Sequence, residues 1–338
     1  MSEGKENPAP PGSPQRIVRG HARTTIRAGA MLLAASASLL GAAPALAADT
    51  AFQPPPKWDI PAAQPRARIA APADMQPITE LKGTALFHHL SLSLEQGWGQ
   101  VESRDDDVPG KTDFRDTTLT LGFRAGSRFF GALSGSYMDS SNDAQNAPRF
   151  GSIPISGNGY TTSFRASGGY MVLPFWAVGA SFGNSDISGG YQYQIPVPRT
   201  GTDGHGFTQS YFTTLSLPAA GWMFSGSLAY TNTDQKQDYA NNFPPGQDSR
   251  FEILTATVGA SRRLGGNWHL RGSLAFNHTL HQSTLEEING LDQNWATLTA
   301  GLSYRVNRSL EIGARVSTWL DNDKNDYTHG IVGVTYHF

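Results

Sequence analysis

Charged side chains that could bind an ion recur along this sequence on a background of small polar residues. Each has serine, threonine, glycine or another member of the set two positions away. The set is Arg124, Arg165, Arg271, Arg305, Arg315, Glu95 and Glu311, with His269 and His337. Arginine outnumbers glutamate in it, which suits either of two arrangements. The arginines form a ladder that selects anions, or arginine and glutamate pair and brace a wall.

Catalytic and metal-binding arrangements have weaker support. His278, His281 and Ser283 are close in sequence, but no third group that would orient a nucleophile is visible. Residues 321–326 resemble a calcium loop in their acids, yet glycine is missing at the sixth position and no glutamate closes the loop. Solvated charge explains this loop, with cation bridging to lipopolysaccharide as the alternative. We therefore expect no enzyme activity, no catalytic residue, no metal site and no cofactor.

The charged set lies on segments whose apolar residues alternate with polar ones. Between 309 and 338, Leu310, Ile312 and Ala314 share one face, while Glu311 and Arg315 share the other. A period of two is the signature of a β-strand. The same alternation recurs in twelve segments from residue 87 onward. The sequence therefore predicts an all-β fold with serine, threonine, glycine and a few charges on one face of each strand.

The connections between these segments alternate in length. Five are tight turns, at 126–128, 173–174, 218–221, 264–267 and 307–308. Six are long polar stretches, at 102–113, 139–157, 187–205, 234–249, 280–292 and 321–326. This rhythm is typical of a transmembrane antiparallel up-and-down β-barrel with long outer loops and both ends in the periplasm. The alternative is a soluble β-sandwich, which would not require the rhythm.

Aromatic residues fall near the ends of the predicted strands, where a membrane girdle is expected. The girdle candidates are Trp98, Trp176, Trp222, Tyr230, Trp268, Tyr304 and Phe338. Mean hydropathy is −0.36, which also suits a barrel, because one face of each strand meets lipid and the other meets water.

The chain ends on Tyr336-His337-Phe338, and this aromatic-x-Phe ending resembles that of bacterial outer-membrane β-barrel proteins. The resemblance implies a place in the cell outer membrane. It also implies contact with outer-membrane lipid and lipopolysaccharide, and recognition of the last strand by the barrel-assembly machinery. The strand count is similar to that of autotransporter translocator barrels, in which a large passenger precedes the barrel.

The N-terminal region predicts export. Residues 1–47 have the layout of a signal peptide, with a basic start, an apolar run at 28–43 and a small-x-small site at 45–47. Residues 48–82 are rich in proline and are expected to form a disordered periplasmic tether, with a plug or a docking peptide as alternatives. The barrel is expected at 83–338. There is no cysteine, so disulfides do not hold it.

Twelve strands should enclose a narrow passage. We predict a porin-like diffusion channel for small polar solutes, with anions and acidic sugars as candidates. The alternatives are a non-conducting surface barrel, an outlet in an exopolysaccharide export assembly, or an autotransporter-like translocator without a large passenger. A net charge of −2 provides no basic footprint, so nucleic acid is not expected as a partner. The sequence does not determine the oligomeric state.

Overall fold

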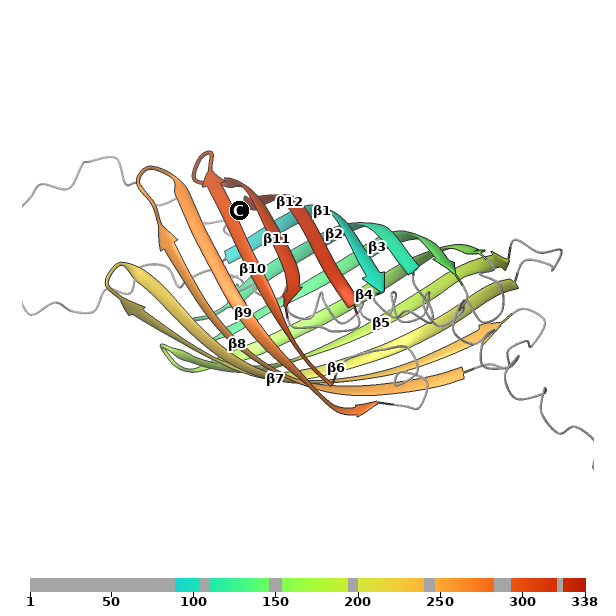
Figure 1. The fold of residues 1–338 in the computed structure, drawn as a ribbon. Helices are drawn as coiled ribbons and strands as arrows, with labels where there is room; N and C mark the ends of the chain where they lie inside the picture. Colours follow the sequence, from blue (N-terminus) through green and yellow to red (C-terminus); the bar gives the residue numbers. More distant parts are fainter. Residues whose placement is uncertain are drawn as a thin grey trace, which may run out of the picture.

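The structure is a computed structural model that describes residues 89–103, 110–145, 154–193, 200–239, 247–282, 293–320 and 325–338. These residues form twelve strands. The strands are tilted and close into one barrel (Figure 1). The described part contains no helix that could cross a membrane. The predicted signal peptide and proline-rich tether lie outside the described residues.

The first six strands are β1 (His89–Ser103), β2 (Gly110–Ala125), β3 (Phe129–Gln145), β4 (Pro154–Leu173), β5 (Trp176–Tyr193) and β6 (Thr200–Ala219). The last six are β7 (Trp222–Tyr239), β8 (Gln247–Arg263), β9 (Trp268–Gln282), β10 (Asn294–Arg305), β11 (Leu310–Leu320) and β12 (Asn325–His337). Each strand pairs antiparallel with its neighbours in sequence, which confirms the predicted up-and-down order.

The ring is closed by β1 and β12. Their ladder runs from Ser91 opposite His337 to Ser103 opposite Asn325. Closure removes the two free sheet edges, whose unpaired backbone groups would each cost several kcal/mol in lipid. The prediction of a sealed twelve-stranded barrel is therefore confirmed, and the sandwich alternative is excluded.

The outer surface of the barrel is apolar. Large hydrophobic side chains point outward at every second position of the strands; Leu94 is 54% exposed and Val258 56% exposed. Exposing side chains of this size to water costs roughly 1.5–3 kcal/mol each. A surface built from such rows suits a lipid environment, as the alternation in the sequence predicts.

Outward aromatic residues recur eight positions apart on two strands, Phe129 and Tyr137 on β3 and Trp222 and Tyr230 on β7. Eight residues at about 3.3 Å, tilted by about 40°, span roughly 20 Å across the membrane. This is of the order of the apolar band of an outer-membrane barrel. The spacing is consistent with the girdle, which stays a prediction.

The tight turns, the start of β1 and the end of β12 all lie at the same end of the cylinder, which we call the turn end. The opposite end is the loop end. At the turn between β6 and β7, Ala220 and Gly221 both have positive φ, 50° and 77°. Two consecutive positive φ values characterise the hairpin turn that matches the twist of paired strands. The turn-end connections thus lie where the sequence predicts them.

The strands at the loop end are longer than predicted. The polar stretches 139–157 and 187–205 were expected to be loops, but β3 continues to Gln145 and β4 begins at Pro154. Asp143 pairs with Ser156 within this extension. Backbone hydrogen bonds hold a ladder whatever the side chains are. Beyond the apolar band both faces carry polar side chains, so the alternation of apolar and polar residues disappears while the strand continues.

Candidate functional site in the barrel lumen

The strand register places the predicted charged set on the inner face. Residues directly opposite each other in a ladder share a face. Glu311 lies opposite Arg305 on β10 and opposite Thr335 on β12. Glu95 lies opposite Gly333 on β12, and Arg315 lies opposite Gly301 on β10. The inner wall over β9 to β12 and β1 therefore carries most of the set.

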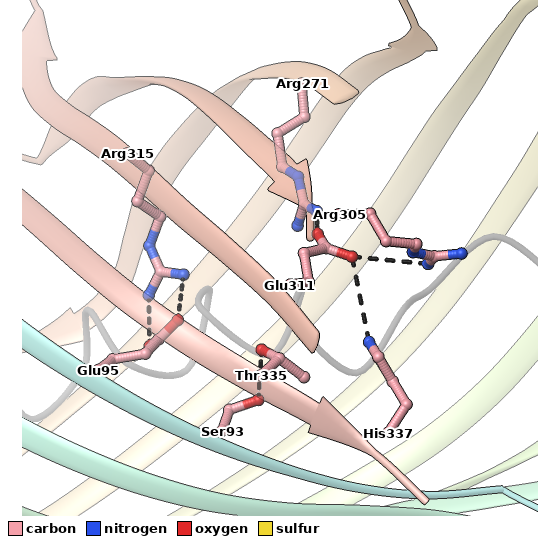
Figure 2. A network of polar contacts seen from close by, with 8 residues as sticks. All are labelled: Ser93, Glu95, Arg271, Arg305, Glu311, Arg315, Thr335 and His337. Carbon is pink, nitrogen blue, oxygen red and sulfur yellow. Dashed lines mark hydrogen bonds and ion pairs between the residues drawn. The ribbon is translucent and has the colours of Figure 1, made fainter. Parts of the chain in front are cut away.

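Arg315 and Glu95 form a two-pronged ion pair across β12 (Figure 2). The Nη1–Oε1 and Nη2–Oε2 distances are 2.8 and 2.9 Å. Only 18% of the arginine side chain and 17% of the glutamate side chain are exposed. Paired, partly buried bonds between charged groups are strong. The pair therefore ties β11 to β1 across the strand that closes the barrel.

Glu311 is shared by three positively charged or titratable groups (Figure 2). Its carboxylate lies 3.4 Å from Nη2 of Arg271, 3.6 Å from Nη2 of Arg305 and 4.0 Å from Nε2 of His337. A 2.9 Å hydrogen bond between Ser93 and Thr335 lies in the same view. The wall-bracing interpretation therefore fits Arg271, Arg305 and Arg315.

Arg124 and Arg165 differ from these three. Among the described residues, neither has a carboxylate within ion-pair distance. Arg165 donates from Nη2 to Ser181 Oγ at 2.5 Å and to Ser210 Oγ at 3.4 Å. Two of the five predicted arginines thus have no counter-charge within the part of the chain that the structure describes.

The sequence-based expectation of a polar lumen is wrong at the loop end. One buried cluster contains Val101, Phe114, Met138 and Tyr327, another contains Phe251, Ile253 and Trp295, and Trp319 packs against both. Trp319 lies 4.9 Å from the Tyr327 ring and 6.0 Å from the Trp295 ring, between centroids. The spacing of residues along each strand could have revealed that these aromatic side chains point inward. Trp319 is an even number of residues from Arg315, and Trp295 from Thr299, so each shares the polar face of its strand.

A histidine–aspartate pair lies beside the first cluster and was also missed. His329 Nε2 is 2.7 Å from Asp116 Oδ1, and the Phe114 ring centroid is 5.1 Å from that of the histidine. A Cβ at Gly97 would collide with Asp116 and His329, and one at Gly99 would collide with Phe114. The two glycines of β1 therefore make room for the pair and its aromatic cover.

The other sequence candidates lie apart from the lumen network. The girdle residue Trp222 lies under Arg262 at 5.4 Å, and Trp268 lies 4.8 Å from Tyr304, between ring centroids. His278 on β9 bonds Asn294 at 2.7 Å. Ser283 and residues 321–324 lie outside the described residues. Within the described ranges, no group of three or more histidine, aspartate or glutamate side chains is placed to hold a metal.

Similar folds occur among solved bacterial barrels, although no protein-family model matches the chain. The translocator domain of autotransporter NalP from Neisseria meningitidis superposes with a TM-score of 0.61 at 14% identity, covering 77% of this chain and 90% of that one. The transport unit of autotransporter AIDA-I from Escherichia coli gives 0.56 at 10% identity, covering 78% and 94%. This chain has the fold of an outer-membrane β-barrel. At such identities the likeness concerns the fold alone.

A sequence relative is also found. A long-chain fatty acid transport protein from Salmonella typhi is 28% identical over 144 residues, which cover 37% of this chain and 32% of that protein. The chain therefore matches about a third of the length of this relative.

Proposed function

We propose that the barrel is a narrow porin-like channel in the cell outer membrane that favours small anionic solutes. The observation that carries this proposal is that Arg124 and Arg165 lie on the inner face with no carboxylate of the described residues within ion-pair distance. Arg271, Arg305 and Arg315 are bound to Glu311 and Glu95, so they contribute to the wall more than to selection.

The sign of the lumen charge supports selection of anions. Five arginines face two glutamates in the predicted set, so three positive charges remain. The register adds Asp116 and Arg263 to the same inner face, and these two opposite charges leave the excess at three among the described residues. The whole chain, by contrast, carries a net charge of −2. Fixed charge inside a narrow bore acts on a passing ion more strongly than charge on an open surface, because low-dielectric walls focus the field.

Recordings of the refolded protein in a planar lipid bilayer test the channel. Under a KCl gradient, we expect discrete conductance steps and a reversal potential shifted toward that of chloride. The double variant Arg124→Gln/Arg165→Gln should shift the reversal potential toward zero or toward cation preference. Arg262→Gln is the matched control, because it removes an arginine from the outer face.

Absence of conductance would contradict the channel and favour a surface barrel or an outlet that works only within a larger assembly. Deleting residues 48–82 separates a closed pore from a plugged one. If the proline-rich segment occupies the bore, the deletion raises conductance; if it is a tether, conductance stays the same. The autotransporter-like alternative has only the fold in its favour, and a shared fold does not carry function.

A second candidate is the transport of long-chain carboxylic acids. The observation in its favour is the inward-facing apolar cluster at the loop end, which a channel for small ions does not need. The relative named as a long-chain fatty acid transport protein points the same way. Titrating oleate while following tryptophan fluorescence tests it. Binding should perturb the emission of Trp295 and Trp319, and no change in either the wild type or single-tryptophan variants would exclude this candidate.

A further inference from the structure

The described inner wall formed by β3 to β6 contains one arginine, Arg165. Its neighbours on that wall are residues with hydroxyl groups and glycines. Arg165 on β4 lies opposite Ser134 on β3 and opposite Gly183 on β5. On its own strand the nearest residues of the same face are Ser163 and Ser167. None of these neighbours carries a charge. The surroundings of Arg165 therefore differ from those of Arg315, which has a carboxylate in direct contact.

The described contacts of Arg165 use one nitrogen. Nη2 donates to Ser181 Oγ and to Ser210 Oγ, and Ser210 is hydrogen-bonded to Thr231 at 2.9 Å. Ser181 and Ser210 are each only 3% exposed. The hydroxyls hold the guanidinium in place as neutral acceptors, but they do not balance its charge.

Removing a charge from water without a counter-charge is costly, and hydroxyl groups recover only part of that cost. A guanidinium has five N–H donors in a planar fork that matches two oxygens of one anion. Serine hydroxyls can also donate to an anion once they rotate. An ionisable group at membrane depth usually marks a solute pathway or binding site. A guanidinium beside two serine hydroxyls is therefore chemically suited to an oxyanion.

We propose that Arg165, Ser181 and Ser210 form an oxyanion-binding site in the lumen, which accepts a carboxylate, phosphate or sulfate group. The guanidinium would grip two oxygens and the serine hydroxyls would donate to the remaining lone pairs. The site rests on the proposed channel for its role in transport. Binding itself does not require conduction, so the two proposals can fail separately.

Isothermal titration of the full-length protein in detergent micelles tests the site, with sodium sulfate, inorganic phosphate and glucuronate as separate probes at constant ionic strength. Arg165→Gln should weaken binding of the preferred probe by about tenfold or more, because a charge-assisted bidentate contact is lost. Ser181→Ala/Ser210→Ala should weaken it by a smaller factor. Arg262→Gln, on the outer face, should bind as the wild type does. The preferred probe distinguishes a tetrahedral anion from an acidic sugar.

Arg165→Lys keeps the charge but not the fork, so it should bind more weakly than the wild type and more tightly than Arg165→Gln. Each variant is first checked for the heat-dependent gel migration of a folded barrel, and the lysine variant remains informative if the glutamine variant does not fold. Equal affinity in the wild type and the Arg165 variants, or no binding of any probe to the wild type, would overturn the site. Binding without conductance would retain the site and remove the channel.

Discussion

The five arginines that the sequence predicts for the lumen have two different environments. Arg271, Arg305 and Arg315 contact carboxylates, whereas Arg124 and Arg165 do not among the described residues. The difference arises from which strands the register places next to each other. A substitution at one arginine should therefore have a different consequence from the same substitution at another.

At Glu95, loss of the carboxylate should destabilise the barrel. Glu95→Gln leaves the Arg315 guanidinium largely buried without a counter-charge, and the expected loss in unfolding free energy is about 2 kcal/mol. Arg315→Gln in the same chain should restore part of that loss, because the unpaired charge is removed. Urea unfolding of the protein in lipid vesicles, followed by tryptophan fluorescence, measures both. Equal stability of Glu95→Gln and the wild type would show that the pair does not brace the wall.

Gly97 should tolerate no side chain. Gly97→Ala would place a Cβ against the Asp116–His329 pair, and overpacking of this kind costs roughly 1–3 kcal/mol. Gly226→Ala is the matched control, because a Cβ at Gly226 meets no atom within 4 Å. The same vesicle unfolding assay should separate the two variants. A similar stability for both would mean that the histidine–aspartate pair moves aside without cost.

At the scale of the elements, one substitution in the hairpin turn between β6 and β7 should increase the stability of the barrel. Ala220 has a φ of 50°, a conformation that asparagine adopts more readily than alanine before a glycine. Ala220→Asn should raise the unfolding free energy by about 0.5–1 kcal/mol, and Ala220→Val should lower it. Urea midpoints of the two variants and the wild type check this ordering. A stabilising valine would indicate that the turn relaxes away from positive φ.

The strand that closes the ring should govern insertion into the membrane. Phe338 donates its backbone N–H to Leu90 of β1 at 3.0 Å, and its ring meets Tyr336 edge-on at 4.9 Å, between centroids. If assembly machinery reads this strand, Phe338→Ala should lower the amount of folded barrel in outer-membrane fractions. Refolding of the same variant into detergent should change much less. An equal loss in both assays would locate the effect in barrel stability instead of recognition.

At the scale of the molecule, the side chains that line the lumen change along its axis from apolar at the loop end to charged toward the turn end. Trp319 packs against both apolar clusters at the loop end, while Arg315 and Glu311 lie further along β11 toward the turn end. Bulky rings that project inward should narrow the passage there. Trp319→Ala is therefore expected to raise single-channel conductance without reversing ion preference, because the arginines remain. Unchanged conductance in bilayer recordings would place the narrowest point elsewhere.

The sequence by itself determined the closed architecture to a large extent. Alternation of side chains follows from the geometry of a single strand, so Leu310 and Glu311 are assigned to opposite faces without any knowledge of neighbours. Turn lengths are equally local, and they gave the antiparallel order and the count. The sequence did not predict where the strands end at the loop end. Backbone pairing continues there although apolar and polar residues no longer alternate.

Only the tertiary structure decided which charges meet. Glu95 and Arg315 are 220 positions apart in the chain, and they touch because β12 lies between their two strands after closure. The same holds for Trp319, whose ring lies against Trp295 of β10 and Tyr327 of β12. Local periodicity states which face a residue occupies. The contact partner depends on register and closure, which are properties of the whole ring.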